Sequence, residues 1–195
     1  MDKKLYYSWQ DVETAARTII LQMYQEQWRP DYIVGITRGG LPLATIISNQ
    51  LDIPMHALGV SFRDSEFGPE SNCWMADDAF GYVDSDSRTS TGCRWDISQR
   101  KNILIVDDIN DSGRTFEWIK QDWQGLCLPS EEHAWDSIWT RSVRFAVMTE
   151  NLGSDFDGVG YHWDTVDKRE EEIWLCYPWE QDAWLRGRKG DNRVV

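Results

Sequence analysis

Three aspartates and a small polar turn lie together in the stretch ILIVDDINDSGRT, residues 103–115. An apolar run leads into Asp107 and Asp108, and Asp111 follows directly before Ser-Gly-Arg-Thr. Backbone N–H groups in such a turn, at the start of a helix, form a site that can cradle a phosphate. Paired carboxylates suit sugar hydroxyls or a hydrated Mg²⁺. The alternative is a simple helix cap, but the apolar run and the acid pair favour the binding site.

A second turn, GITRGG at 35–40, follows a β-branched run and precedes a stretch of helical length. Its glycines allow close backbone approach, and Arg38 offers a fork of donors to a diphosphate. A tight strand-to-helix turn without a ligand would use the same residues. Neither turn fits the GxxxxGK[ST] loop or the GxGxxG motif, which argues against nucleotide hydrolysis and dinucleotide binding.

The elements that carry these turns alternate between strand and helix. Helical spacing of apolar residues predicts helices over 8–27, 41–51 and 115–122, and short apolar runs predict strands at 31–36, 54–62, 102–108 and 142–150. Such alternation predicts an α/β fold with a mostly parallel sheet flanked by helices. Ligands bind these sheets beyond the carboxyl ends of the strands, where both turns fall.

Length and charge narrow the function classes. A chain of 195 residues with 41% hydrophobic content can bury a core and is predicted to form one domain. The net charge of −13 opposes general binding to nucleic acid or to an anionic membrane. No apolar run reaches the ~18 residues that a bilayer span needs. A small-molecule partner is therefore expected.

The cysteines and two polar segments complete the expectations. Four cysteines without a CxxC pair, and without a preceding signal peptide, are expected to be free thiols in a reducing cytoplasm. Residues 63–99, rich in Asp, Ser, Gly and Thr, are predicted to be a long surface segment with a short strand at FGYV. The acidic run KREEE, 168–172, is interpreted as a solvated turn.

The stretch VDDINDSGRT resembles the phosphoribosyl-diphosphate (PRPP) motif of type I phosphoribosyltransferases. Three further stretches resemble the xanthine-guanine branch of that family: YYSWQDVETAARTI, GITRGGLPLATIISNQLDIP and IWLCYPWE. The matches cover most of the chain outside 63–99 and 124–141. The resemblance implies one domain over 1–195, with a parallel sheet, flanking helices and a small hood formed by terminal segments.

The resemblance also implies a reaction. The 5-phosphoribosyl group of PRPP would be transferred to a purine-like nitrogenous base, with release of diphosphate and with Mg²⁺ as cofactor. The partners would be these small molecules, and neither nucleic acid nor a membrane is expected. The protein would act in the cytoplasm. It could form a homo-oligomer. The alternative is a non-catalytic PRPP-binding regulator, since one fold can serve several functions.

Each acid of the first motif acquires a role from the resemblance. Asp107 and Asp108 would hold the ribose hydroxyls and the Mg²⁺ shell. Asp111 would act as the general base that takes the proton of the attacking ring nitrogen. The 5′-phosphate would be cradled by Ser112, Gly113, Arg114 and Thr115.

The remaining roles fall on three other stretches. Ser61 and Phe62 would stand at the root of a mobile loop over about 63–99 that closes the site. Trp174 and Leu175 would contact the base from the hood. The diphosphate would be bound at a turn that often has a cis peptide in the family, by Thr37, Arg38 and Gly39.

The chain departs from the branch at the base site. Val147 and Met148 are taken to occupy the place of a lysine that recognises the exocyclic oxygen of the purine. Their presence predicts a loss of selectivity for 6-oxopurines and a changed base preference. Residues 124–141 are expected to be an insertion between a helix and a strand.

Overall fold

The structure is a computed structural model that describes residues 3–60, 73–83, 94–127 and 134–180. Its centre is a five-stranded sheet in the order β3-β2-β6-β7-β8, with every neighbouring pair parallel. The strands are β2 (Tyr32–Ile36), β3 (Met55–Leu58), β6 (Ile103–Asn110), β7 (Val143–Asn151) and β8 (Val159–Val166). The predicted α/β sheet is confirmed.

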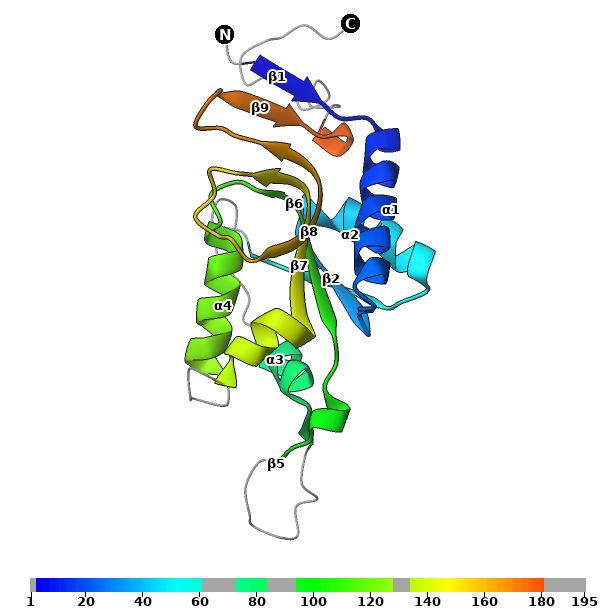
Figure 1. The fold of residues 1–195 in the computed structure, drawn as a ribbon, viewed down its shortest axis with the longest axis vertical. Coiled ribbons are helices and arrows are strands. Elements are labelled where there is room, and N and C mark those ends of the chain that lie inside the picture. Colours follow the sequence, from blue (N-terminus) through cyan, green and yellow to red (C-terminus); the bar gives the residue numbers. More distant parts are fainter. Residues whose placement is uncertain (1–2, 61–72, 84–93, 128–133, 181–195) are drawn as a thin grey trace, which may run out of the picture.

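Helices cover both faces of this sheet (Figure 1). One side carries α1 (Trp9–Gln25) and α2 (Gly40–Leu51), and the other carries α4 (Arg114–Leu126). The apolar run that begins β6 is buried between these layers, because Ile103, Leu104, Ile105 and Val106 are all fully inaccessible. A strand buried on both faces is expected to be apolar throughout, as this one is.

The first helix shows why the sequence folds in this way. Ser8 caps α1 and forms a capping box with Asp11, so two backbone N–H groups at the helix start find partners. Val12, Ile19 and Met23 recur at helical spacing and are buried. The predicted helix from Ser8 to about Gln27 is confirmed.

The two ends of the described chain meet above the sheet. Strand β1 (Lys3–Tyr6) pairs in parallel with β9 (Ile173–Cys176), and Lys4 lies opposite Trp174. Figure 1 shows this two-stranded hood at one end of the molecule, next to the ends of β6 and β7. The hood of terminal segments implied by the resemblance is therefore present.

Part of the segment over 63–99 differs from the predicted surface loop. Residues Cys73–Phe80 form α3, and Met75, Ala79 and Phe80 are buried. After α3, β4 (Tyr82–Val83) pairs with β5 (Arg94–Trp95), which confirms the predicted strand at FGYV. A 3₁₀ turn, η1 (Ile97–Gln99), follows β5. The side chains of α3 give it an apolar face, so this part packs into the core. Residues 61–72 and 84–93 lie outside the described ranges.

The predicted insertion over 124–141 contributes to the same core. Trp135 and Ile138 are fully buried, and the Trp135 ring meets Phe80 edge-on at 4.6 Å between centroids. A short π-helical turn, η3 (Ile138–Ser142), then leads into β7. None of the described helices is both long and apolar enough to cross a membrane.

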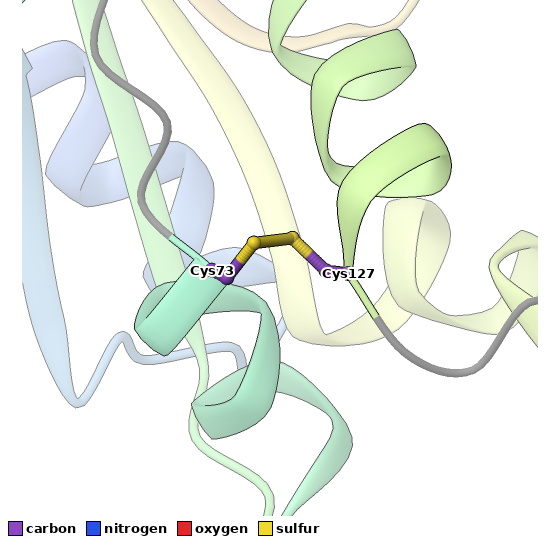
Figure 2. The surroundings of a disulfide bond; sticks show 2 residues. All are labelled: Cys73 and Cys127. Carbon is purple, nitrogen blue, oxygen red and sulfur yellow. A yellow bond between two sulfur atoms is a disulfide. The ribbon is translucent and has the colours of Figure 1, made fainter.

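One expectation about the cysteines is wrong. Cys73 at the start of α3 and Cys127 at the end of α4 form a disulfide, with 5.5 Å between their Cα atoms (Figure 2). Packing of α3 beside the end of α4 brings the two residues together, which their spacing in the sequence does not reveal. Cys176 is a free thiol, and Cys93 lies outside the described residues.

Candidate active site

A cavity of about 580 Å³ lies beyond the carboxyl ends of β2 and β6, with β9 of the hood in its wall. It brings together most of the predicted site residues. Those in its wall are Thr37, Gly39, Asp107, Asp108, Asp111, Ser112, Gly113, Arg114, Thr115, Trp174 and Leu175. Among the described residues that were assigned a catalytic or binding role, Arg38 alone is not part of this wall. Ser61 and Phe62 lie outside the described residues.

The turn after β2 approaches the acid pair very closely. The peptide bond between Thr37 and Arg38 is cis, as the resemblance led us to expect. A Cβ atom added to Gly39 would lie 2.2 Å from Asp108 Oδ2, well inside van der Waals contact. Glycine is therefore required here because the start of α2 packs directly against the Asp108 carboxylate.

Asp107 and Asp108 follow the four fully buried residues of β6 and are themselves half-buried. The Asp108 N–H donates to Asp107 Oδ1 at 2.9 Å, and the Ile109 N–H donates to Asp108 Oδ1 at 2.9 Å. Burial raises the pKa of both carboxyl groups, and the charge of Asp108 raises the pKa of Asp107 further. A bound cation would relieve this cost.

Charge in the cavity is unbalanced. Four acids and two cations line it: Asp107, Asp108, Asp111, Glu180, Arg114 and Lys168. A diphosphate ligand would add more negative charge to a wall that already carries a net −2 by this count. An anionic substrate therefore requires a cation to accompany it.

The turn between β6 and α4 is held by glycine and by a buried asparagine. Gly113 has φ +80°, and a Cβ there would lie 2.5 Å from the Cβ of Phe156. Asn110, 2% exposed, donates to the Phe156 carbonyl at 2.9 Å and to Glu150 Oε1 at 2.8 Å, and accepts from Ser154 Oγ at 3.0 Å. These contacts fix the turn, so its N–H groups precede α4 in a preset arrangement.

Eight residues in the wall were not predicted, and two of them make polar contacts with the aspartates of the site. The first of these two is Tyr177. Its hydroxyl donates to the Asp108 carbonyl at 3.2 Å and lies 3.2 Å from Thr149 Oγ1. Its ring stacks on Tyr7 and on Trp179, with centroids 5.3 and 4.9 Å apart. Burial raises the pKa of Tyr177, so the hydroxyl stays a neutral donor. Tyr177 thus joins the hood to the end of β6.

The second residue is Lys168, in the acidic run interpreted as a solvated turn. Its Nζ lies 2.8 Å from Asp111 Oδ1, and its side chain is only 27% exposed. The interpretation is wrong for this residue, which lies in the cavity wall. No periodicity or spacing in the sequence signals this position, because the contact depends on how the chain returns from β8 to β9.

The expected position of Val147 and Met148 at the base site is also wrong. Both side chains are completely buried within β7, in the hydrophobic core. They do not contribute to the cavity wall, so they are not the residues that face a bound base.

Comparison with known proteins agrees with this geometry. The model of the phosphoribosyl transferase domain family matches residues 3–121. The chain is 22% identical over 206 residues to xanthine phosphoribosyltransferase 1 of Saccharomyces cerevisiae, covering 93% of this chain and 91% of that protein. It is 28% identical over 186 residues to the xanthine-guanine phosphoribosyltransferase of Cereibacter sphaeroides, covering 92% and 88%.

A solved structure shows the same fold. The purine phosphoribosyltransferase from Pyrococcus horikoshii superimposes with a TM-score of 0.58 at 22% identity, covering 100% of this chain and 98% of that one. The family match, the motifs and the shared fold agree. The chain therefore belongs to the type I phosphoribosyltransferase family and resembles its xanthine-guanine branch.

Proposed function

We propose that the protein transfers the 5-phosphoribosyl group of PRPP to a purine base. In this reaction a ring nitrogen of the base forms a bond to the anomeric carbon, the bond from that carbon to the diphosphate oxygen breaks, and the ring nitrogen loses its proton. The observation that carries the proposal is the single cavity that joins Thr37, Gly39, the acid pair, the 112–115 turn and Trp174. Purine names among the relatives support the base class.

The two ends of PRPP have complementary sites in this cavity. The turn before α4 offers backbone N–H groups and the Arg114 side chain to the 5′-phosphate. Thr37 and Gly39 offer a close backbone approach to the diphosphate. Asp107 and Asp108 lie between these turns in the fold and suit the ribose hydroxyls.

Mg²⁺ fits the acid pair. Among the residues that the structure describes, no group of three or more acids, histidines or cysteines could hold a metal alone. Mg²⁺ is commonly held by one or two carboxylates together with substrate phosphates, which is the donor set that Asp107 and Asp108 would provide. Held by Asp107 and Asp108, Mg²⁺ would supply positive charge to offset that of the diphosphate.

Asp111 and Trp174 serve the base. The Asp111 carboxylate is about half exposed and accepts the proton of the attacking nitrogen. The Trp174 side chain, 61% exposed in the hood, offers a flat face on which a purine can stack. Leu175 adds apolar contact beside it. This arrangement orients the base toward the anomeric carbon.

Diphosphate release tests the proposal. The protein is incubated with PRPP, Mg²⁺ and one base at a time: xanthine, guanine, hypoxanthine, adenine, orotate or uracil. We expect release with at least one purine and none with orotate or uracil. PRPP binding is measured in parallel by calorimetry. Tight PRPP binding without diphosphate release for any base would contradict the proposal and favour the non-catalytic regulator.

A further inference from the structure

Each strand of the hood is followed by a buried tyrosine. Tyr7 comes directly after β1 and Tyr177 directly after β9, and the Tyr7 N–H donates to the Cys176 carbonyl at 2.9 Å. The two tyrosines are 4% and 3% exposed, and their rings stack on each other. Both hood strands therefore lead into the core at the same place.

A chain of hydrogen bonds runs from these tyrosines across the sheet. The Tyr7 hydroxyl donates to Asp164 Oδ2 on β8 at 2.8 Å, and Thr149 Oγ1 on β7 donates to the Tyr7 hydroxyl at 3.2 Å. The Tyr177 hydroxyl lies 3.2 Å from Thr149 Oγ1 and 3.2 Å from the Asp108 carbonyl on β6. The chain thus connects the hood to three neighbouring strands.

The protons of this chain determine which contacts can form. A hydroxyl has one proton to donate, and Thr149 donates its proton to Tyr7. The one proton of Tyr177 is therefore shared between two acceptors, Thr149 Oγ1 and the Asp108 carbonyl. Burial raises the pKa of Tyr177, which keeps this proton on the hydroxyl. Removing the Thr149 acceptor would leave the proton to Asp108 alone.

The base site and the PRPP site lie on different parts of the fold. Trp174 and Leu175 belong to β9 of the hood, whereas the two turns that would hold PRPP follow β2 and β6 of the sheet. Asp108 is itself held within β6, because the residues on either side of it pair with β7. Loss of the Tyr177 hydroxyl should therefore displace the hood and not the acid strand.

We propose that Tyr177 is a positioning residue, whose hydroxyl sets the base site of the hood against the strand of the acid pair. This inference rests on the proposed transfer reaction. The same hydrogen bond is present before and during transfer, so its loss should weaken binding of the base without slowing the transfer step. One neutral hydrogen bond corresponds to a change of about 3- to 10-fold in a binding constant.

Tyr177→Phe tests the inference, because it removes the hydroxyl and keeps the ring that stacks on Tyr7 and Trp179. For the purine that the wild type uses best, kcat and KM are measured, and PRPP binding is measured by calorimetry. Tyr161→Phe is the matched control. Tyr161 is 1% exposed near the start of β8, outside the cavity wall, and its hydroxyl donates to Glu26 Oε2 at 3.1 Å.

Thr149→Val provides a second comparison. Valine has nearly the shape of threonine but offers Tyr177 no acceptor, so the Tyr177 proton is left to the Asp108 carbonyl. The KM of the base should therefore not rise in this variant. Circular dichroism shows whether each variant folds. If Tyr177→Phe does not fold, Thr149→Val decides: a KM that does not rise supports the inference, and a raised KM overturns it.

We expect Tyr177→Phe to raise the KM of the base about 3- to 10-fold, with kcat and PRPP affinity within about twofold of the wild type. Tyr161→Phe should lose stability but keep the kinetics of the wild type. An unchanged KM with a lowered Tm would mean a merely structural hydroxyl and would overturn the inference, as would an equal loss of PRPP affinity. A wild type that transfers to no base would refute the proposed function, and the inference with it.

Discussion

Replacing Gly39 by alanine tests whether the turn after β2 and the acid pair form one binding site. Gly39 has φ −64° and ψ −39°, a conformation that alanine adopts without strain. The added Cβ, however, would lie 2.2 Å from Asp108 Oδ2, 2.4 Å from Cγ and 2.7 Å from Oδ1. The substitution therefore acts on the neighbouring carboxylate and not on the backbone of the turn.

The size of the effect follows from this clash. Ordinary contact begins near 3.4 Å, so Asp108 Oδ2 must move by about 1.2 Å. Such a shift pulls Oδ1 away from the Ile109 N–H, now at 2.9 Å. Loss of one charge-assisted contact to the ribose or to Mg²⁺ costs about 1.5–3 kcal/mol, and we expect PRPP to bind about 10- to 100-fold more weakly.

Calorimetric titration with PRPP and Mg²⁺ measures the change. Gly125→Ala is the control, because nothing lies within 4 Å of a Cβ at that position in α4. The control should bind PRPP normally and gain up to about 1 kcal/mol of stability, since alanine has a higher helix propensity than glycine. If Gly39→Ala binds PRPP within about twofold of the wild type, the Asp108 carboxylate does not hold PRPP and the reasoning fails.

The other predictions concern the metal, the acid pair and the disulfide. Chelation of Mg²⁺ should weaken PRPP binding by about 100-fold or more, since metal neutralisation of phosphate charge contributes several kcal/mol; undiminished binding in excess chelator would refute this. Burial raises the pKa of Asp107, so the fold disfavours the charged form of this carboxyl group at neutral pH. Asp107→Asn should therefore raise the Tm of the ligand-free protein by a few degrees and weaken PRPP binding. A lower Tm would contradict the argument. Cys73 and Cys127 are 54 residues apart, so reduction of their disulfide should lower the free energy of unfolding by up to about 4 kcal/mol in the chain-entropy model. If mass spectrometry detects alkylation of both thiols before any reduction, the disulfide is absent.

The strands and the turns were predictable from sequence because their signals are local. The apolar run before Asp107 and the glycines at 39 and 113 reflect burial and close approach, which act within a few residues. The capping box at Ser8 is likewise a short-range pattern. The position of both turns along the chain could therefore be predicted from local sequence patterns.

The parts that sequence reasoning missed depend on contacts between distant segments. Lys168 looks like any surface lysine until the β8–β9 connection is placed against Asn151. The Cys73–Cys127 bond requires α3 to pack beside the end of α4. Strand β8 carries little alternation, since only Tyr161 and Val166 are buried along it. Such features follow from tertiary packing, which composition and periodicity do not encode.

Single-turnover transfer from PRPP to hypoxanthine tests the central claim most directly, with the wild type beside Asp111→Asn. The asparagine keeps the shape of the side chain but cannot take the proton, so only the transfer step should suffer. We expect the wild type to form inosine 5′-monophosphate and diphosphate in equal amounts, and Asp111→Asn to do so about 10²- to 10⁴-fold more slowly with nearly unchanged PRPP affinity. PRPP recovered intact from the wild type, or an Asp111→Asn rate close to that of the wild type, would contradict the account.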